Sequence, residues 1–202
     1  MPDDTRELFA TMTERYRSGN VPWAAELPPP EIIDLVAELP SGRALDLGCG
    51  LARACIYLAG LGWRCDGVDF VPEAIEQARQ RVAAAGVDDR VSLHLTPVTE
   101  LDFLDPPYDL AIDVGCLHAQ PVASLPGYAR QLRRLLRPGG AYILFTHLRD
   151  SDTVDENRWA TEAAVRDLFR DGFVIDRVAH GSTVMPDATW PSAWFWMRRT
   201  TV

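Results

Sequence analysis

The chain has few of the features that mark a membrane, secreted or metal-binding protein. No apolar segment approaches the ~20 residues of a membrane span, and the N-terminal Met1-Pro-Asp-Asp lacks the basic and apolar pattern of a signal peptide. The four cysteines include no Cys-x-x-Cys spacing, and the four histidines form no closely spaced metal-ligand pair. We therefore expect a cytoplasmic protein with reduced thiols, no membrane association and no metal site.

Positive charge is also scarce. The chain has 20 Lys and Arg residues against 29 Asp and Glu, and its formal net charge of −9 would repel a phosphate backbone. A predicted helix that ends at Pro138 carries a group of cations near its C-terminus, where they suit the helix dipole and solvent. These cations are Arg130, Arg133, Arg134 and Arg137. The composition thus disfavours nucleic acid as a partner.

The pattern of apolar residues indicates the fold class. The 202 residues suit one domain with a sizeable core, since apolar residues make up 47% of them. From residue 43 onward, apolar runs alternate with helical patterns, which is typical of parallel strands joined by crossover helices. The sequence therefore predicts an α/β fold with a doubly wound, mostly parallel sheet.

The boundaries of the later elements follow from periodicity and from Pro and Gly. A helix from Pro72 presents an apolar face and ends near Gly86. That face consists of Ile75, Ala78, Val82 and Ala85. Strands are expected at 91–95, 108–113 and 141–146, and helices at 122–137 and 161–169. Strands at 173–179 and 193–199, joined by a loop rich in turn residues, can only pair antiparallel.

The most informative segment is Arg43-Ala-Leu-Asp-Leu-Gly-Cys-Gly-Leu-Ala-Arg53, in which an apolar run ends in an acid and two glycines before a helical pattern begins. Gly48 and Gly50 can adopt backbone angles closed to other residues, so the chain can turn sharply and let a ligand approach the main chain. The helix that follows directs free N–H groups at that ligand. The segment predicts a strand, a nucleotide-binding turn and a helix start.

A second acid sharpens this prediction. The strand-like run Trp63-Arg-Cys-Asp-Gly-Val-Asp69 ends 19 positions after Gly50, and an acid at that distance can accept both ribose hydroxyls. With Asp46 two residues before Gly48, the chain resembles class I S-adenosylmethionine-dependent methyltransferases. A nicotinamide-dependent oxidoreductase would need a third glycine where Ala54 or Cys55 stands.

Further segments narrow the resemblance. Tyr16-Arg-Ser-Gly-Asn-Val-Pro-Trp23, Pro28-Pro-Pro-Glu31 and Asp113-Val-Gly-Cys-Leu-His118 are similar to the small-molecule branch that contains thiopurine and tellurite-resistance methyltransferases. The resemblance implies one methyltransferase domain over 1–202, with a seven-stranded Rossmann-like core at 41–202 and an antiparallel C-terminal strand. It implies that residues 1–40, with an expected helix carrying Phe9, Met12 and Tyr16, fold over the cofactor as a lid.

The resemblance also implies the cofactor, S-adenosyl-L-methionine, and its binding residues. Two positions depart from the family pattern: Ala52 replaces the third turn glycine, and Pro97 replaces the acid that usually meets the adenine amino group. Adenine would then depend on main-chain groups of Val98 or Thr99. The expected cofactor-binding residues are Trp23, Asp46, Gly48, Cys49, Gly50, Asp69, Phe70, Val98, Thr99 and Val114.

The segment Asp105-Pro-Pro-Tyr108 resembles a tetrapeptide of amino-methyltransferases that act on adenine, cytosine or glutamine. In those families it closes the fourth strand, whereas here Tyr108 begins the expected strand. Two prolines before a strand favour a turn.

Two residues are candidates for catalysis. His118 follows the fourth strand by five residues, at the carboxyl edge where open sheets bind ligands, and Asp113 ends that strand. Either could accept a proton, and His118 could instead orient the acceptor. A thiolate, halide or tellurium acceptor would need neither. We expect in-line methyl transfer to a small-molecule acceptor by a monomer or homodimer; an S-adenosylmethionine-binding regulator without activity and a nicotinamide-dependent oxidoreductase stay as alternatives.

Overall fold

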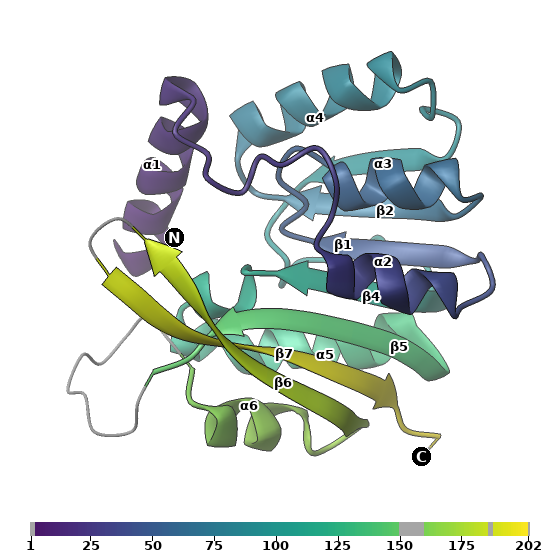
Figure 1. Ribbon diagram of the computed structural model, residues 1–202, viewed down its shortest axis with the longest axis vertical. Coiled ribbons are helices and arrows are strands. Elements are labelled where there is room, and N and C mark those ends of the chain that lie inside the picture. The colour runs from purple at the N-terminus through teal and green to yellow at the C-terminus, as the bar shows by residue number, and fades with distance from the viewer. Residues whose placement is uncertain (1–2, 150–159, 186–187, 202) are drawn as a thin grey trace.

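One seven-stranded sheet organises the molecule (Figure 1). The computed structural model describes residues 3–149, 160–185 and 188–201. The strands are β1 (Arg43–Leu47), β2 (Arg64–Asp69), β3 (Val91–Leu95), β4 (Tyr108–Val114), β5 (Leu136–His147), β6 (Phe173–Met185) and β7 (Ala188–Arg199). Their order is β3-β2-β1-β4-β5-β7-β6, with β1 to β5 parallel and β7 antiparallel to both of its neighbours. The predicted fold class is confirmed.

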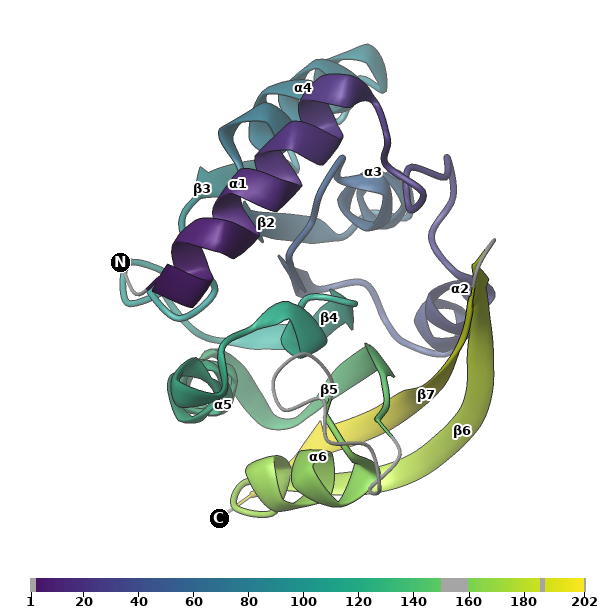
Figure 2. The same cartoon turned by 90° about the vertical axis from the view of Figure 1, so that its left-hand side faces the viewer.

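Helices cover both faces of the sheet (Figure 2). They are α1 (Asp3–Ser18), α2 (Pro30–Ala37), α3 (Arg53–Gly60), α4 (Pro72–Ala84), α5 (Leu125–Leu135) and α6 (Glu162–Phe169), with short 3-10 turns at η1 (Leu117–Ala119) and η2 (Val122–Ser124). Apolar residues of α2, α3 and α4 pack in one core cluster, and those of α5 and α6 pack in another. Helix α1 stands beside the carboxyl ends of the parallel strands (Figure 1). Within the described ranges, no helix is long and apolar enough to cross a membrane.

Local sequence explains where the helices begin and end. Pro72 occupies the first turn of α4, where a missing N–H costs nothing, and Gly86 takes a positive φ of 66° just after its end. The predicted apolar face of α4 is buried except for Ala85, which is exposed at the C-cap. The Thr161 side chain caps α6 by accepting a hydrogen bond from the Ala164 N–H at 3.1 Å.

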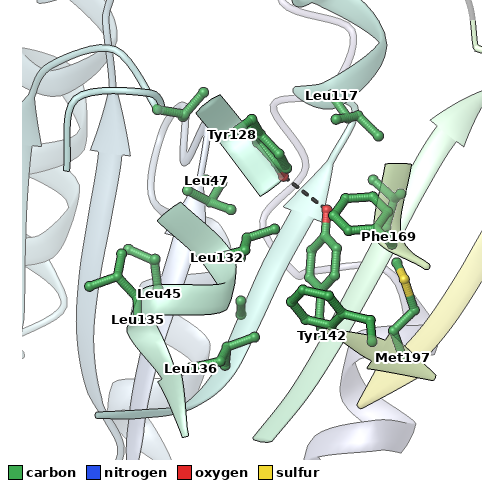
Figure 3. Close-up of a cluster of buried hydrophobic side chains, with 14 of the residues drawn as sticks. Leu45, Leu47, Leu117, Tyr128, Leu132, Leu135, Leu136, Tyr142, Phe169 and Met197 are labelled. Atoms are coloured by element: carbon green, nitrogen blue, oxygen red, sulfur yellow. Dashed lines mark hydrogen bonds between the residues drawn. The ribbon is translucent and has the colours of Figure 1, made fainter. Parts of the chain in front are cut away.

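The core beneath α5 and α6 is rich in aromatic rings (Figure 3). Phe169 of α6 meets Tyr128, Tyr142 and Phe173 edge-on, with ring centroids 5.4 to 6.5 Å apart. The buried hydroxyls of Tyr128 and Tyr142 lie 2.9 Å apart and share a hydrogen bond. Because these rings come from α5, α6, β5 and β6, they fasten the C-terminal half of the chain to the sheet.

The helix predicted at 122–137 is shorter than expected. Residues 122–124 form η2, α5 ends at Leu135, and β5 already begins at Leu136. Pro126 fits the first turn of α5, which sets the start of the helix. The pairing of β5 with β4 shifts between Tyr108 and Leu110, so the Pro138-Gly-Gly140 segment forms an irregularity inside the strand, with Gly139 at φ 73°.

The loop predicted between 179 and 193 is also wrong. Strands β6 and β7 stay paired out to Met185 and Ala188, beyond the last β5–β7 pair, His147 with Ser192. Turn-forming residue types such as Gly181 and Ser182 can lie in a strand when a partner strand supplies the hydrogen bonds. The two strands therefore form a long hairpin that reaches past β5.

The two prolines of Asp105-Pro-Pro-Tyr108 stand before β4, as expected, and Tyr108 is the first residue of that strand. The Tyr108 hydroxyl donates a hydrogen bond to Asp66 of β2 at 2.8 Å. This segment is therefore part of the scaffold at the amino end of the sheet.

Replacing Phe169 with Ala should destabilise the protein by about 3–5 kcal/mol, because it opens a cavity among three aromatic rings. Phe103→Ala is the matched control, since that ring is 53% exposed, and it should change stability by less than about 1 kcal/mol. Urea unfolding of both variants measures the difference. Equal losses would contradict the role assigned to the aromatic core.

Candidate active site

The turn between β1 and α3 is built from residues in left-handed backbone conformations. Gly48 has φ 71°, Gly50 has φ 53°, and Ala52 has φ 60°. The N–H groups of Gly48 and Cys49 donate to the Val68 carbonyl at 2.8 and 2.9 Å, which ties the turn to β2. Ala52 adopts the conformation that a glycine would take at the same place, so its substitution preserves the turn.

The two glycines also permit close packing. A Cβ on Gly48 would lie 2.7 Å from the Cβ of Cys116, which follows β4, and a Cβ on Gly50 would lie 2.9 Å from the Tyr16 hydroxyl. The turn is thus wedged between the end of β4 and the N-terminal segment.

Asp69 fastens this turn to the end of β2. Its carboxylate accepts hydrogen bonds from the N–H groups of Gly50, at 3.0 Å, and Val71, at 2.9 Å. Burial raises the pKa of Asp69 and these backbone donors act against that rise. Each oxygen accepts one of these bonds and retains further lone-pair capacity toward a ligand.

A cleft opens beside the turn, with about 440 Å³ of empty space, part of it open to solvent. Its lining includes six of the predicted cofactor residues: Trp23, Asp46, Gly48, Cys49, Gly50 and Val114. It also includes residues that were not predicted to bind the cofactor, namely Ala24, Ala25, Pro29, Ile32, Leu51, Arg53 and Ala54. The glycine turn and the N-terminal segment therefore face each other across one cleft.

Two charged residues in the lining interact. Burial raises the pKa of Asp46 to about 7, while the Cys55 thiol, which donates to it at 3.5 Å, and the Arg53 charge lower it. Arg53 is the first residue of α3 and, among the described residues, the one cation in the lining of this cleft. No motif pointed to Arg53; only its place one residue past the turn could have drawn attention to it.

The N-terminal segment is held against the core by its aromatic residues. The Trp23 indole N–H donates to the Tyr16 hydroxyl at 3.1 Å, and the Phe9 ring meets Phe70 with centroids 5.8 Å apart. Burial raises the pKa of Tyr16, and the nearby Asp69 carboxylate adds to this effect. The expected apolar face of α1 thus lies on the core, beside the cleft.

The other four predicted cofactor residues, Asp69, Phe70, Val98 and Thr99, lie outside the lining of the cleft, although Asp69 binds the Gly50 N–H at its edge. The Phe70 ring meets Phe9 of α1 edge-on, and Val98 is buried in the core beneath α5. The Thr99 carbonyl accepts a hydrogen bond from Gln131 at 3.5 Å.

Asp113 is fully buried at the end of β4. One carboxylate oxygen accepts from the N–H groups of Cys116 and Leu117, at 2.7 and 3.3 Å, and the other accepts from the Tyr128 hydroxyl at 2.5 Å. Burial raises the pKa of Asp113 to about 7 and these three donors oppose the rise. The geometry suits holding the turn that carries His118 better than direct proton transfer to a substrate.

His118 lies in η1, against the end of β5. Its Nδ1 accepts a hydrogen bond from the His147 backbone N–H at 3.2 Å, and the two imidazole rings lie 4.5 Å apart. Burial, with a smaller contribution from His147, lowers the pKa of His118 to about 3. The sequence placed His118 at this edge, but no motif assigned a role to His147.

The strand order, the acid–glycine turn and the acid ending β2 define a class I methyltransferase. Comparison with known proteins agrees. Residues 44–140 match the family described as a methyltransferase domain. The chain is 28% identical over 161 residues to a 2-heptyl-1-hydroxyquinolin-4(1H)-one methyltransferase of Mycobacteroides abscessus, which covers 78% of this chain and 70% of that protein.

Solved structures show the same fold. A Burkholderia thailandensis 1,6-didemethyltoxoflavin-N1-methyltransferase with bound S-adenosylhomocysteine aligns with TM-score 0.76 and 25% identity, covering 99% of this chain and 91% of that one. TehB from Haemophilus influenzae aligns with TM-score 0.75 over 94% of this chain and 67% of that one, at 14% identity, which bears on the fold alone. Four further curated relatives match 51–57% of this chain, which spans only 25–35% of their length.

The chain is therefore a class I S-adenosylmethionine-dependent methyltransferase of the small-molecule branch, and it transfers a methyl group to a small-molecule acceptor. The methyltransferase prediction is confirmed at this level. The comparisons favour it over both alternatives, the nicotinamide-dependent oxidoreductase and the non-catalytic regulator.

Gly48→Ala should lower the melting temperature by much more than Gly86→Ala does. Both glycines have positive φ, so both changes strain the backbone, but a Cβ at Gly86 meets nothing within 4 Å whereas one at Gly48 meets Cys116. We expect about 1 kcal/mol for Gly86→Ala and at least twice that for Gly48→Ala. Thermal unfolding of both variants measures the ratio, and similar losses would contradict the tight packing of the turn.

Asp113 should make stability pH-dependent in a defined direction. Its pKa is raised in the folded state, so its contribution to stability is present below its unfolded value, 3.8, and is lost as pH rises through about 7. The lowered pKa of His118 and His147 acts oppositely, so the variant must be compared with wild type at each pH.

The melting temperature of wild type relative to Asp113→Asn should fall as pH rises from about 5 to 7 and should level off above about 7, where the carboxyl is ionised in both states. Asp176→Asn is the control: the Asp176 pKa is lowered by Arg198, so its contribution is lost only in acid and its difference from wild type should stay constant over this window. A flat Asp113→Asn difference would show that the carboxyl is ionised throughout.

Proposed function

We propose that S-adenosyl-L-methionine binds in the cleft beside the β1–α3 turn. The observation that carries this is the Asp69 carboxylate, which holds the Gly50 N–H at the edge of the cleft and keeps lone pairs for the ribose hydroxyls. The residues present fit the group: the cleft combines the exposed main chain of Gly48 and Gly50 with the cation of Arg53 and the aromatic ring of Trp23.

Arg53 would pair with the carboxylate of the cofactor. It is the cation among residues that are otherwise apolar, neutral or acidic in this lining, and a buried carboxylate ligand requires an opposite charge or N–H donors. Trp23 would cover the methionine part, and main-chain groups of Val98 and Thr99 would meet the adenine.

When bound, S-adenosylmethionine supplies an electrophilic methyl group on its sulfonium. The chain would contribute orientation and exclusion of water, since a well-oriented pair of reactants has a barrier lower by about 7–11 kcal/mol. The Asp113 carboxylate would hold the 114–118 turn, and His118 would contact the acceptor.

The acceptor class that we propose is a planar heteroaromatic molecule. The Mycobacteroides abscessus relative is named for a hydroxyquinolinone and the Burkholderia thailandensis structure for a didemethyltoxoflavin, and both substrates are nitrogen heterocycles. Aromatic side chains of β5 and β7, at the edge of the sheet where the parallel strands end, suit the binding of such a ring.

Other features stay predictions. These are the single domain over 1–202, the lid at 1–40, the cytoplasmic location, and the monomeric or homodimeric state. The four free cysteines accord with a reducing compartment.

Calorimetric titration with S-adenosylhomocysteine, with NADH in parallel, tests the proposal. Wild type should bind S-adenosylhomocysteine and not NADH, and Arg53→Gln should weaken binding about tenfold through loss of a charged hydrogen bond. Arg64→Gln, at the exposed start of β2, is the matched control and should bind like wild type. Binding of NADH without S-adenosylhomocysteine would refute the proposal.

A further inference from the structure

His118 presents one defined hydrogen-bonding group to its surroundings. The His147 backbone N–H can only donate, so Nδ1 of His118 must offer a lone pair to receive this hydrogen bond. A neutral imidazole then carries its proton on Nε2. In this tautomer Nε2 is a donor, and it has no lone pair with which to accept a proton.

The ring is held in this state from two sides. Its stacking on the His147 ring, with an interplanar angle of 32°, disfavours a second positive charge there, and burial lowers the pKa of His118. The hydrogen bond and the stack both come from His147, so β5 sets the orientation and the tautomer of a residue on η1.

The donor edge of the ring lies close to Gly115, the neighbour in sequence of a residue that lines the cofactor cleft. A Cβ on Gly115 would lie 3.2 Å from Cε1 and 3.9 Å from Nε2 of His118, and Gly115 directly follows Val114, which lines the cleft. Gly115 has φ 89°, so a side chain there would both strain the backbone and press on the ring. The Nε2–H group therefore lies near the backbone of Gly115, one residue beyond the lining of the cleft.

Aromatic rings continue from His118 onto β5 and β7. The His147 ring meets Phe145 at 5.5 Å and Trp190 at 5.2 Å, and its Nε2 lies 3.0 Å from the Thr183 hydroxyl on β6. The part of the β6–β7 hairpin that reaches past β5 thus supplies one side of this group. Flat rings of this kind favour a planar aromatic ligand.

Both acid–base candidates at this edge already accept hydrogen bonds from other groups of the protein. Asp113 is fully buried with three donors on its carboxylate, and His118 accepts from a backbone N–H. An acceptor whose oxygen must lose a proton would find no base in either.

We propose that His118, Phe145, His147 and Trp190 form an acceptor subsite for an aromatic oxygen acid that reacts as its anion, with the Nε2–H of His118 donating to the nucleophilic oxygen. The inference rests on the proposed methyl transfer. One lone pair of the anionic oxygen forms the bond to the methyl carbon, the carbon–sulfur electrons pass to sulfur, and no proton moves in the step. His118 orients and stabilises the anion.

Nitrogen-15 NMR of histidine-labelled protein tests the tautomer without turnover. His118 should show the neutral Nε2–H form from about pH 5.5 to 8, and the signal assigned to it should vanish in His118→Gln. A neutral Nδ1–H form, or titration near pH 6.5, would overturn the inference.

Absorbance of para-nitrophenol tests the anion. With S-adenosylhomocysteine-saturated protein, the bound probe should ionise at lower pH than the free probe. His118→Gln keeps an N–H donor near the Nε2 position and should retain most of this shift, whereas His118→Leu should lose it and bind the phenolate about tenfold more weakly. His180→Leu is the control, because His180 is exposed and pairs with Glu162.

Calorimetry with S-adenosylhomocysteine separates the two proposals. If wild type binds it but does not shift the ionisation of para-nitrophenol, the subsite inference fails and the proposed cofactor site stands. If wild type does not bind it, the proposed function fails, and the NMR tautomer still decides the state of His118. Equal loss of the probe shift in His118→Gln and His118→Leu would also overturn the donor role.

Discussion

The two hydrogen bonds to the Asp69 carboxylate set the geometry on which the cofactor cleft depends. The bond from Gly50 joins the end of β2 to the turn after β1 and brings that turn within reach of Tyr16 on the N-terminal segment, while the bond from Val71 fixes the carboxylate itself. Three left-handed residues within five positions would otherwise have large conformational freedom. A buried carboxylate with two backbone donors removes that freedom at the point where a ligand must meet a fixed surface.

The Asp113 carboxylate fixes a second turn at the carboxyl edge of the sheet, the one that follows β4. Asp113 binds the N–H groups that open η1, and the Tyr128 and Tyr142 hydroxyls behind it connect it to the aromatic core under α5 and α6. The raised pKa of Asp113 indicates that this charge is held at a cost in free energy. Such a cost is consistent with a group retained for the position of the turn rather than for stability.

The sequence predicted the parts of the structure that depend on local signals. Glycine spacing located the turn at Gly48 and Gly50, and a helical period with Pro72 and Gly86 located α4. The C-terminal hairpin was underestimated because its outer half contains turn-forming residue types, and the pairing that makes them a strand comes from a second segment. Pro138-Gly-Gly140 suggested a boundary but lies within β5, since the irregularity depends on the register against β4.

The sequence likewise predicted only part of the site. Residues within the glycine motif reached the cleft, but the sequence assigned no role to Arg53 or His147, because one depends on the direction of a helix start and the other on a strand end 29 residues from its partner. The contact between His118 and His147, which are far apart in the sequence, decides the chemistry available to His118. Residue type alone gave His118 two roles, as base or as orienting group, and the backbone N–H of His147 separates them by fixing where the single ring proton resides. A titratable residue at an active-site edge therefore cannot be assigned a direction of proton transfer until the partner of its second nitrogen is known.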